Sequence, residues 1–161
     1  MLLCVFLVSC SLISPSYAYS NLNKIELRAF GTETQQLVVY LNVPSFSSSL
    51  YNYTVQNWKC PITINYQLTY NLNTGEITSV NFLGSEIVPG TAMTADERAH
   101  LLDLNYESAN LRITNSGHSV TCNYSAQAHL VYYEFPSVLQ HPEHVTTYLT
   151  AAPVTHTPPL E

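Results

Sequence analysis

Residues 62–70, ITINYQLTY, alternate strictly between apolar and polar side chains. Successive side chains of a β-strand point to opposite faces of its sheet, so this period of two predicts a strand with one buried face. Residues 71–75, NLNTG, contain the Asn and Gly that favour a tight turn, and residues 76–83 are again typical of a strand. Together these segments predict an antiparallel hairpin.

Extended segments of the same character flank this hairpin. We expect strands over residues 24–30, 35–42 and 106–114, and a long one over residues 118–135, in which every second residue from position 120 to 132 is apolar or aromatic. The connections are short, and strands do not alternate with helices. This pattern favours a mainly β protein with a single antiparallel β-sandwich-like domain, and an α+β sheet is the open alternative.

One short helix is predicted near residues 94–104. Thr94-Ala95-Asp96-Glu97 has the form of a capping box, in which the Thr hydroxyl and the Glu carboxylate each satisfy a free amide of the first turn. Leucines at positions 101, 102 and 104 supply an apolar edge. So short a helix is not stable alone, so we expect it to pack against the sheet.

The N-terminal residues predict export. Residues 1–14 are apolar and uncharged, and Ser16-Tyr17-Ala18 has the small residues that a signal-peptide cleavage site needs. The apolar stretch is shorter than the roughly 20 residues of a membrane-spanning helix, so no transmembrane span is expected in the mature protein. Leu7-Val8-Ser9-Cys10 is an alternative signal, a bacterial lipobox that would make the protein a lipoprotein anchored at Cys10. Both interpretations predict a secreted or periplasmic protein.

Four cysteines are present, and two of them lie in the predicted leader. The remaining pair, Cys60 and Cys122, predicts one disulfide, because disulfides persist in exported proteins. Closing a loop of roughly 60 residues would contribute roughly 4 kcal/mol of stability. The alternative is a pair of buried free thiols.

The length of 161 residues suits one domain. We therefore divide the chain into a signal peptide over residues 1–18, a disulfide-stapled β-rich domain over residues 19–135, and a tail over residues 136–161. The tail is rich in Pro and Thr and has little periodicity.

Charge excludes one class of partner. Only 10% of the residues are charged, the net charge is −6, and the five Lys and Arg residues are scattered along the chain. Nucleic-acid binding requires clustered basic side chains that neutralise phosphates. We therefore expect no nucleic-acid partner.

No catalytic motif is apparent in the sequence. The HExxH zinc motif, the GxSxG nucleophile elbow and a Gly-rich phosphate loop are all missing. His141-Pro142-Glu143-His144 is the most metal-like cluster, but Pro142 disrupts the helical spacing that brings paired His ligands together. We therefore assign no catalytic residue, no metal and no cofactor, and we expect a protein that is not an enzyme.

The outward faces of two predicted strands carry amide, hydroxyl and aromatic side chains with few charges. Such groups suit recognition of a protein or glycan, because they offer contact area and hydrogen bonds at low entropic cost. The expected ligand-binding residues are Thr63, Asn65, Gln67, Thr69, Gln127, His129 and Tyr133.

The expected function is therefore an exported, non-catalytic binding domain that recognises a protein or glycan at the cell surface or in the periplasm. The alternatives are a structural subunit of a surface or secretion assembly, and a small secreted hydrolase with an unrecognised site. Asn52-Tyr53-Thr54 and Asn123-Tyr124-Ser125 are acceptor sequences for N-glycosylation, which would be used only in a eukaryotic secretory route.

Overall fold

The computed structural model describes residues 29–134 and 142–160, and these residues form antiparallel β-strands with no helix. The strands are β1 (Phe30–Val43), β2 (Phe46–Ser47), β3 (Thr54–Val55), β4 (Trp58–Asn71), β5 (Ile77–Ile87), β6 (Ala99–Thr114), β7 (Ser119–Tyr132), β8 (Glu143–Thr150) and β9 (Val154–His156).

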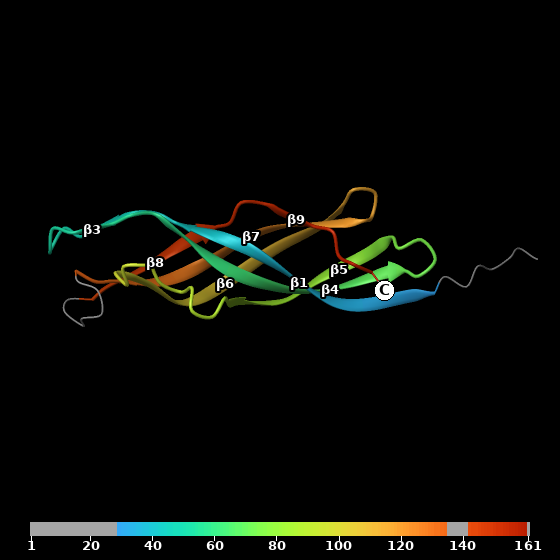
Figure 1. Ribbon diagram of the computed structural model, residues 1–161, viewed down its shortest axis with the longest axis horizontal. Coiled ribbons are helices and arrows are strands. Elements are labelled where there is room, and N and C mark those ends of the chain that lie inside the picture. The colour runs from blue at the N-terminus through green and yellow to red at the C-terminus, as the bar shows by residue number, and fades with distance from the viewer. Residues whose placement is uncertain (1–28, 135–141, 161) are drawn as a thin grey trace, which may run out of the picture.

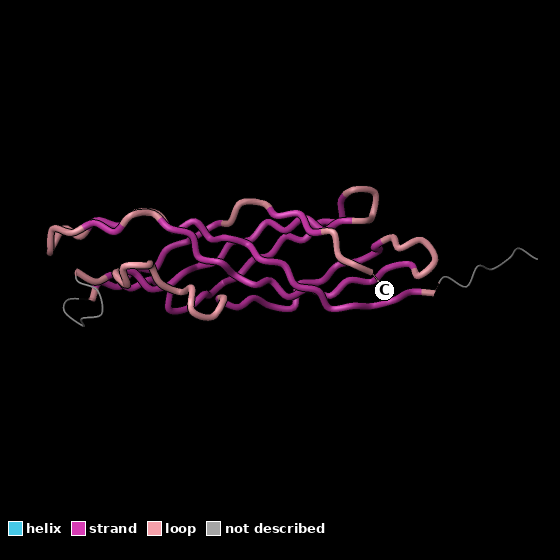
Figure 2. Tube along the Cα trace, in the orientation of Figure 1, coloured by secondary structure: helices cyan, strands magenta, loops and turns pink. Residues whose placement is uncertain are grey.

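Two antiparallel sheets contain most of the strands. The first sheet has the order β1-β4-β5, and the second has the order β6-β7-β8 with β9 also paired to β7. Strands β2 and β3 form a separate small ribbon. Figure 1 shows that the long strands of both sheets run along the long axis of a narrow molecule. Figure 2 shows that strands make up more of the chain than loops do. The prediction of a mainly β, antiparallel fold is confirmed.

The central strands β4 and β7 provide most of the core. Ile62, Ile64, Tyr66 and Leu68 on β4 are fully buried, as are the alternate residues of β7 that include Leu130. The residues between them on each strand stay partly exposed, as the period of two predicts. The buried faces of the two sheets therefore pack against each other.

The seam between β5 and β6 is one place where the edges of the two sheets meet. Each strand carries a β-bulge here, at the register shifts after Asn65 on the β4–β5 ladder and after Asn105 on the β6–β7 ladder. The hydroxyl of Ser85 donates to the carboxylate of Glu107 and also lies 2.8 Å from the hydroxyl of the buried Tyr124. Bulges reorient side chains along a strand, and here they accompany a polar cluster that joins the two sheets.

The predicted helix near residues 94–104 is wrong. The hydroxyl of Thr94 does accept hydrogen bonds, from the amides of Arg98 and Ala99, both at 3.1 Å. Glu97, however, has a φ of 56°, which ends any helical continuation, and β6 begins at Ala99. Ala99 and Leu101 are both buried in the core, so tertiary burial in a sheet overrides the local capping signal.

The predicted disulfide is also wrong, because Cys60 and Cys122 are buried free thiols. The hydroxyl of Tyr66 on β4 hydrogen-bonds His156 on β9, and His156 pairs with Val120 on β7. The start of β7, which carries Val120 and Cys122, therefore lies opposite Tyr66. Tyr66 lies six residues from Cys60 along β4, which is about 20 Å in a strand. A disulfide requires Cα atoms within roughly 7 Å of each other. Burial raises the pKa of each thiol to about 11.

Both predicted domain boundaries, after residues 18 and 135, lie outside the described residues. The leader over residues 1–18, including Cys10, lies outside the described residues. The segment over residues 136–161, expected to be a tail, supplies β8 and β9 to the second sheet. Val145 and Leu149 on β8 point toward the core, which gives this Thr-rich strand its own period of two. No helix among the described residues is long and apolar enough to cross a membrane.

Candidate functional site

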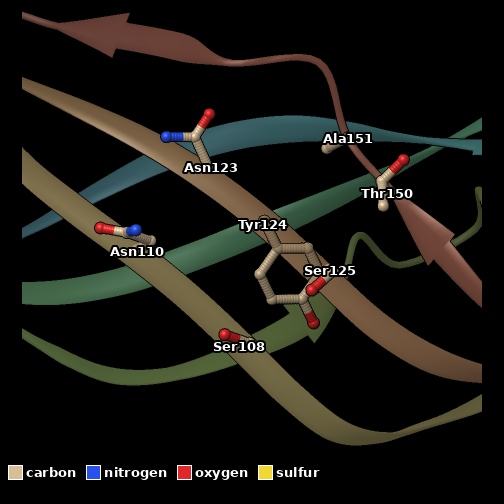
Figure 3. Close-up of a pocket in the computed structure, with 7 residues that line it drawn as sticks. All are labelled: Ser108, Asn110, Asn123, Tyr124, Ser125, Thr150 and Ala151. Atoms are coloured by element: carbon tan, nitrogen blue, oxygen red, sulfur yellow. The ribbon is translucent and has the colours of Figure 1, made fainter.

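A hollow of about 340 Å³ lies on the second sheet, at the place where β8 ends (Figure 3). It is formed by β6, β7, the last residue of β8 and the residue that follows it, and Asn110 and Asn123 stand on the neighbouring strands β6 and β7. We call it the amide hollow. Its lining residues are Ser108, Asn110, Asn123, Tyr124, Ser125, Thr150 and Ala151.

Strand register explains why these polar residues meet. Asn110 is paired with Asn123, Ser108 with Ser125, and Ser125 with Thr150. Side chains of directly paired residues lie on the same face of a sheet, about 5 Å apart. Two amides and three hydroxyls therefore converge, and none of the lining side chains carries a charge. Such a lining can both donate and accept hydrogen bonds, so it suits a neutral, polar ligand.

An exposed aromatic side chain lies beside the amide hollow. Tyr148 on β8 is 67% exposed, and it is two residues before Thr150 on the same outward face. It is paired with Gln127 on β7. A tyrosine ring in this position offers a rigid apolar surface next to a polar recess.

The outward face of β7 continues from the hollow to a histidine pair. The Nε2 atom of His129 lies 3.0 Å from the Nδ1 atom of His144 on β8. On the other side, the Nδ1 atom of His129 lies 3.6 Å from a carboxylate oxygen of Asp103 on β6. Tyr133 lies just past the end of β7, where its ring meets the edge of His100 with centroids 5.4 Å apart.

The structure thus separates the residues expected to bind a ligand into two groups. Gln127 and His129 share the outward face of β7 with the amide hollow, and Tyr133 lies beyond the strand end. Thr63, Asn65, Gln67 and Thr69 lie instead on the partly exposed face of β4, in the first sheet on the opposite side of the sandwich. Asn65 there accepts a hydrogen bond of 2.7 Å from Gln36. One compact ligand cannot contact both groups.

Sequence reasoning missed five residues around the amide hollow: Ser108, Asn110, Thr150, Ala151 and Tyr148. Each is a polar, small or aromatic residue without a motif. The first three and Tyr148 join the site only through strand pairing with β7 or its neighbours, and Ala151 joins it through a backbone hydrogen bond to the carbonyl of Tyr124. Asn123 is the lining residue that the sequence could have indicated, since it is a predicted outward residue on β7 and part of a glycosylation acceptor sequence.

A second hollow of about 500 Å³ lies near the start of β4. Its lining includes Trp58, Asp96 and Arg98, and the guanidinium of Arg98 sits 5.3 Å from the ring centroid of Tyr53. A hydrogen bond from Thr94 is the main cause of a lowered pKa at Asp96. The carboxylate of Asp96 accepts a hydrogen bond from the backbone N–H of Arg98 in the same turn, so these polar groups stabilise the turn itself. We therefore regard the amide hollow as the stronger candidate.

The cluster His141-Pro142-Glu143-His144 does not form a local metal site among the described residues. His141 lies outside them, and Glu143 and His144 alternate between the inner and outer faces of β8. Nor do the described residues contain any group of three or more His, Cys, Asp or Glu side chains that could hold a metal ion.

No protein-family model, no curated protein and no solved structure matches the chain.

Proposed function

We propose that this protein is a non-catalytic binding module that recognises a neutral glycan through the amide hollow. The observation that supports this most is the combination of an uncharged, amide- and hydroxyl-lined recess with the exposed ring of Tyr148 beside it. A sugar ring presents hydroxyls on its rim and C–H groups on its faces. The rim would be recognised by hydrogen bonds in the hollow, and a face would pack on the tyrosine ring.

The size and charge of the hollow favour this ligand class over others. A volume of about 340 Å³ is close to the lower end of the range for small-molecule sites, roughly 300–1,000 Å³, and suits one or two sugar rings. The net charge of −6 disfavours anionic ligands, and the lining supplies no carboxylate for a cationic one. A protein partner that presents neutral polar side chains is the second possibility.

A glycan array probed with the purified protein tests the proposal. We expect selective binding that Tyr148→Ala weakens at least tenfold. Tyr40→Ala is the matched control, because Tyr40 is 51% exposed and lies on the first sheet. Binding that Tyr40→Ala abolishes and Tyr148→Ala spares would assign recognition to the other sheet. A blank array would reject the glycan and leave the protein partner to be tested by pull-down.

Export to the cell surface or periplasm is part of the proposal and rests on the leader sequence, since the cysteines are not paired. The mature N-terminus tests it. Edman sequencing is expected to begin at Tyr19, after cleavage at Ala18. A diacylglycerol-modified Cys10 would support the lipoprotein alternative, and an intact Met1 would contradict both.

A further inference from the structure

His129 and His144 are placed like two ligands of one metal ion. They stand on the adjacent strands β7 and β8, and their facing nitrogens are 3.0 Å apart. Two nitrogens bound to one ion at about 2.0–2.1 Å lie about 2.9 Å apart at a right angle and about 3.4 Å apart at the tetrahedral angle. The observed separation, a hydrogen-bond distance between the two rings, falls between these values, and the ring of His144 is exposed to solvent.

Asp103 supplies the outer carboxylate that such a site uses. It is paired with His129 across β6 and β7, and its carboxylate faces the ring nitrogen that points away from His144. A carboxylate at this position favours the tautomer with the proton on Nδ1, which leaves the Nε2 lone pair free. Histidine ligands of metals usually give their second N–H to a carboxylate or carbonyl, and Asp103 lies at ion-pair distance, 3.6 Å, from this nitrogen.

From this arrangement we propose that His129 and His144 bind one divalent transition-metal ion, with Asp103 orienting His129 and water completing the coordination. Imidazole nitrogen suits Zn²⁺, Ni²⁺ and Cu²⁺, and the affinity of such sites is highest for Cu²⁺. The thiols of Cys60 and Cys122 are fully buried, so they do not compete for the ion in the folded protein. The site has two protein ligands from two strands and does not depend on the glycan proposal.

Calorimetric titration of the full chain with ZnCl₂ tests the site. We expect saturable binding of one ion, which His129→Gln and His144→Gln each abolish. Asp103→Asn should weaken binding about ten- to a hundredfold, the usual effect of losing an outer-shell partner. His118→Gln is the matched control, because His118 is exposed in the turn between β6 and β7 and should leave the affinity unchanged.

Further measurements guard against a trivial loss of binding. Thermal unfolding of each variant shows whether it is folded, and the imidazole ¹⁵N resonances of the unmodified protein report the ligands directly. On addition of Zn²⁺ we expect large shifts at His129 Nε2 and His144 Nδ1. No saturable binding, unchanged affinity in either folded His variant, or abolition by His141→Gln would overturn the proposal, the last because it would assign the ion to the cluster over residues 141–144.

Discussion

Because Cys60 and Cys122 are free thiols, the effect of a reductant on stability tests the packing of the two sheets. If Cys60 and Cys122 were linked, reducing them would remove roughly 4 kcal/mol for a loop of roughly 60 residues. For a chain of 161 residues this loss would lower the Tm by roughly 8–16 °C. In the structure, the residue opposite the start of β7, where Cys122 lies, is Tyr66, and Tyr66 is about 20 Å along β4 from Cys60. We therefore expect a reductant to leave the Tm unchanged.

Differential scanning calorimetry with and without tris(2-carboxyethyl)phosphine gives the Tm. Alkylation followed by peptide mass spectrometry gives the state of each thiol. In the native protein both thiols should react very slowly, because they are fully buried and burial raises their pKa to about 11. In denaturant without reductant both should be alkylated. A peptide that joins Cys60 to Cys122, together with a Tm that falls by 8 °C or more on reduction, would refute the sheet packing described above.

Three further changes probe other contacts. Glu107→Ala removes the acceptor at the β5–β6 seam and should lower the free energy of unfolding by about 1–3 kcal/mol in urea titrations, whereas the exposed Glu86→Ala should change it little. Gly31→Ala places a Cβ 2.6 Å from the ring of Tyr70 and should cost about 1–3 kcal/mol by the same assay; an unchanged midpoint would contradict that close contact. Burial lowers the pKa of His156, so the unfolded chain binds its proton first as the pH falls below about 6.5, and stability should drop there; His156→Gln should flatten this dependence.

The parts of the fold that follow from local patterns could be predicted from the sequence. The β4–β5 hairpin and the buried face of β7 depend on a period of two and on turn residues, both of which are read within a few neighbouring residues. The helix near residues 94–104 failed because the Thr94 hydroxyl does accept backbone amides, but Ala99 and Leu101 are buried in a strand instead of a helix. The period of β8 was hidden because its inward positions include Thr147.

The pairing of distant segments could not be predicted in the same way. The two cysteines were paired by count and compartment, but the distance between them depends on how the sheets align. For the same reason Gln127 and His129 could be placed on a polar face, whereas Asn110 and Thr150 join that face only through the registers of β6 and β8. The sequence likewise could not show that the polar faces of β4 and β7 belong to different sheets, because that depends on strand order.

Shift mapping tests most directly whether the amide hollow is the ligand-binding surface. The side-chain amide resonances of Asn110, Asn123 and Asn65 would be followed while a glycan selected on the array is added. We predict saturable shifts at Asn110 and Asn123 and none at Asn65, which lies on the opposite sheet. Saturable shifts at Asn65 with Asn110 and Asn123 unmoved would contradict the claim and place recognition on the face of β4.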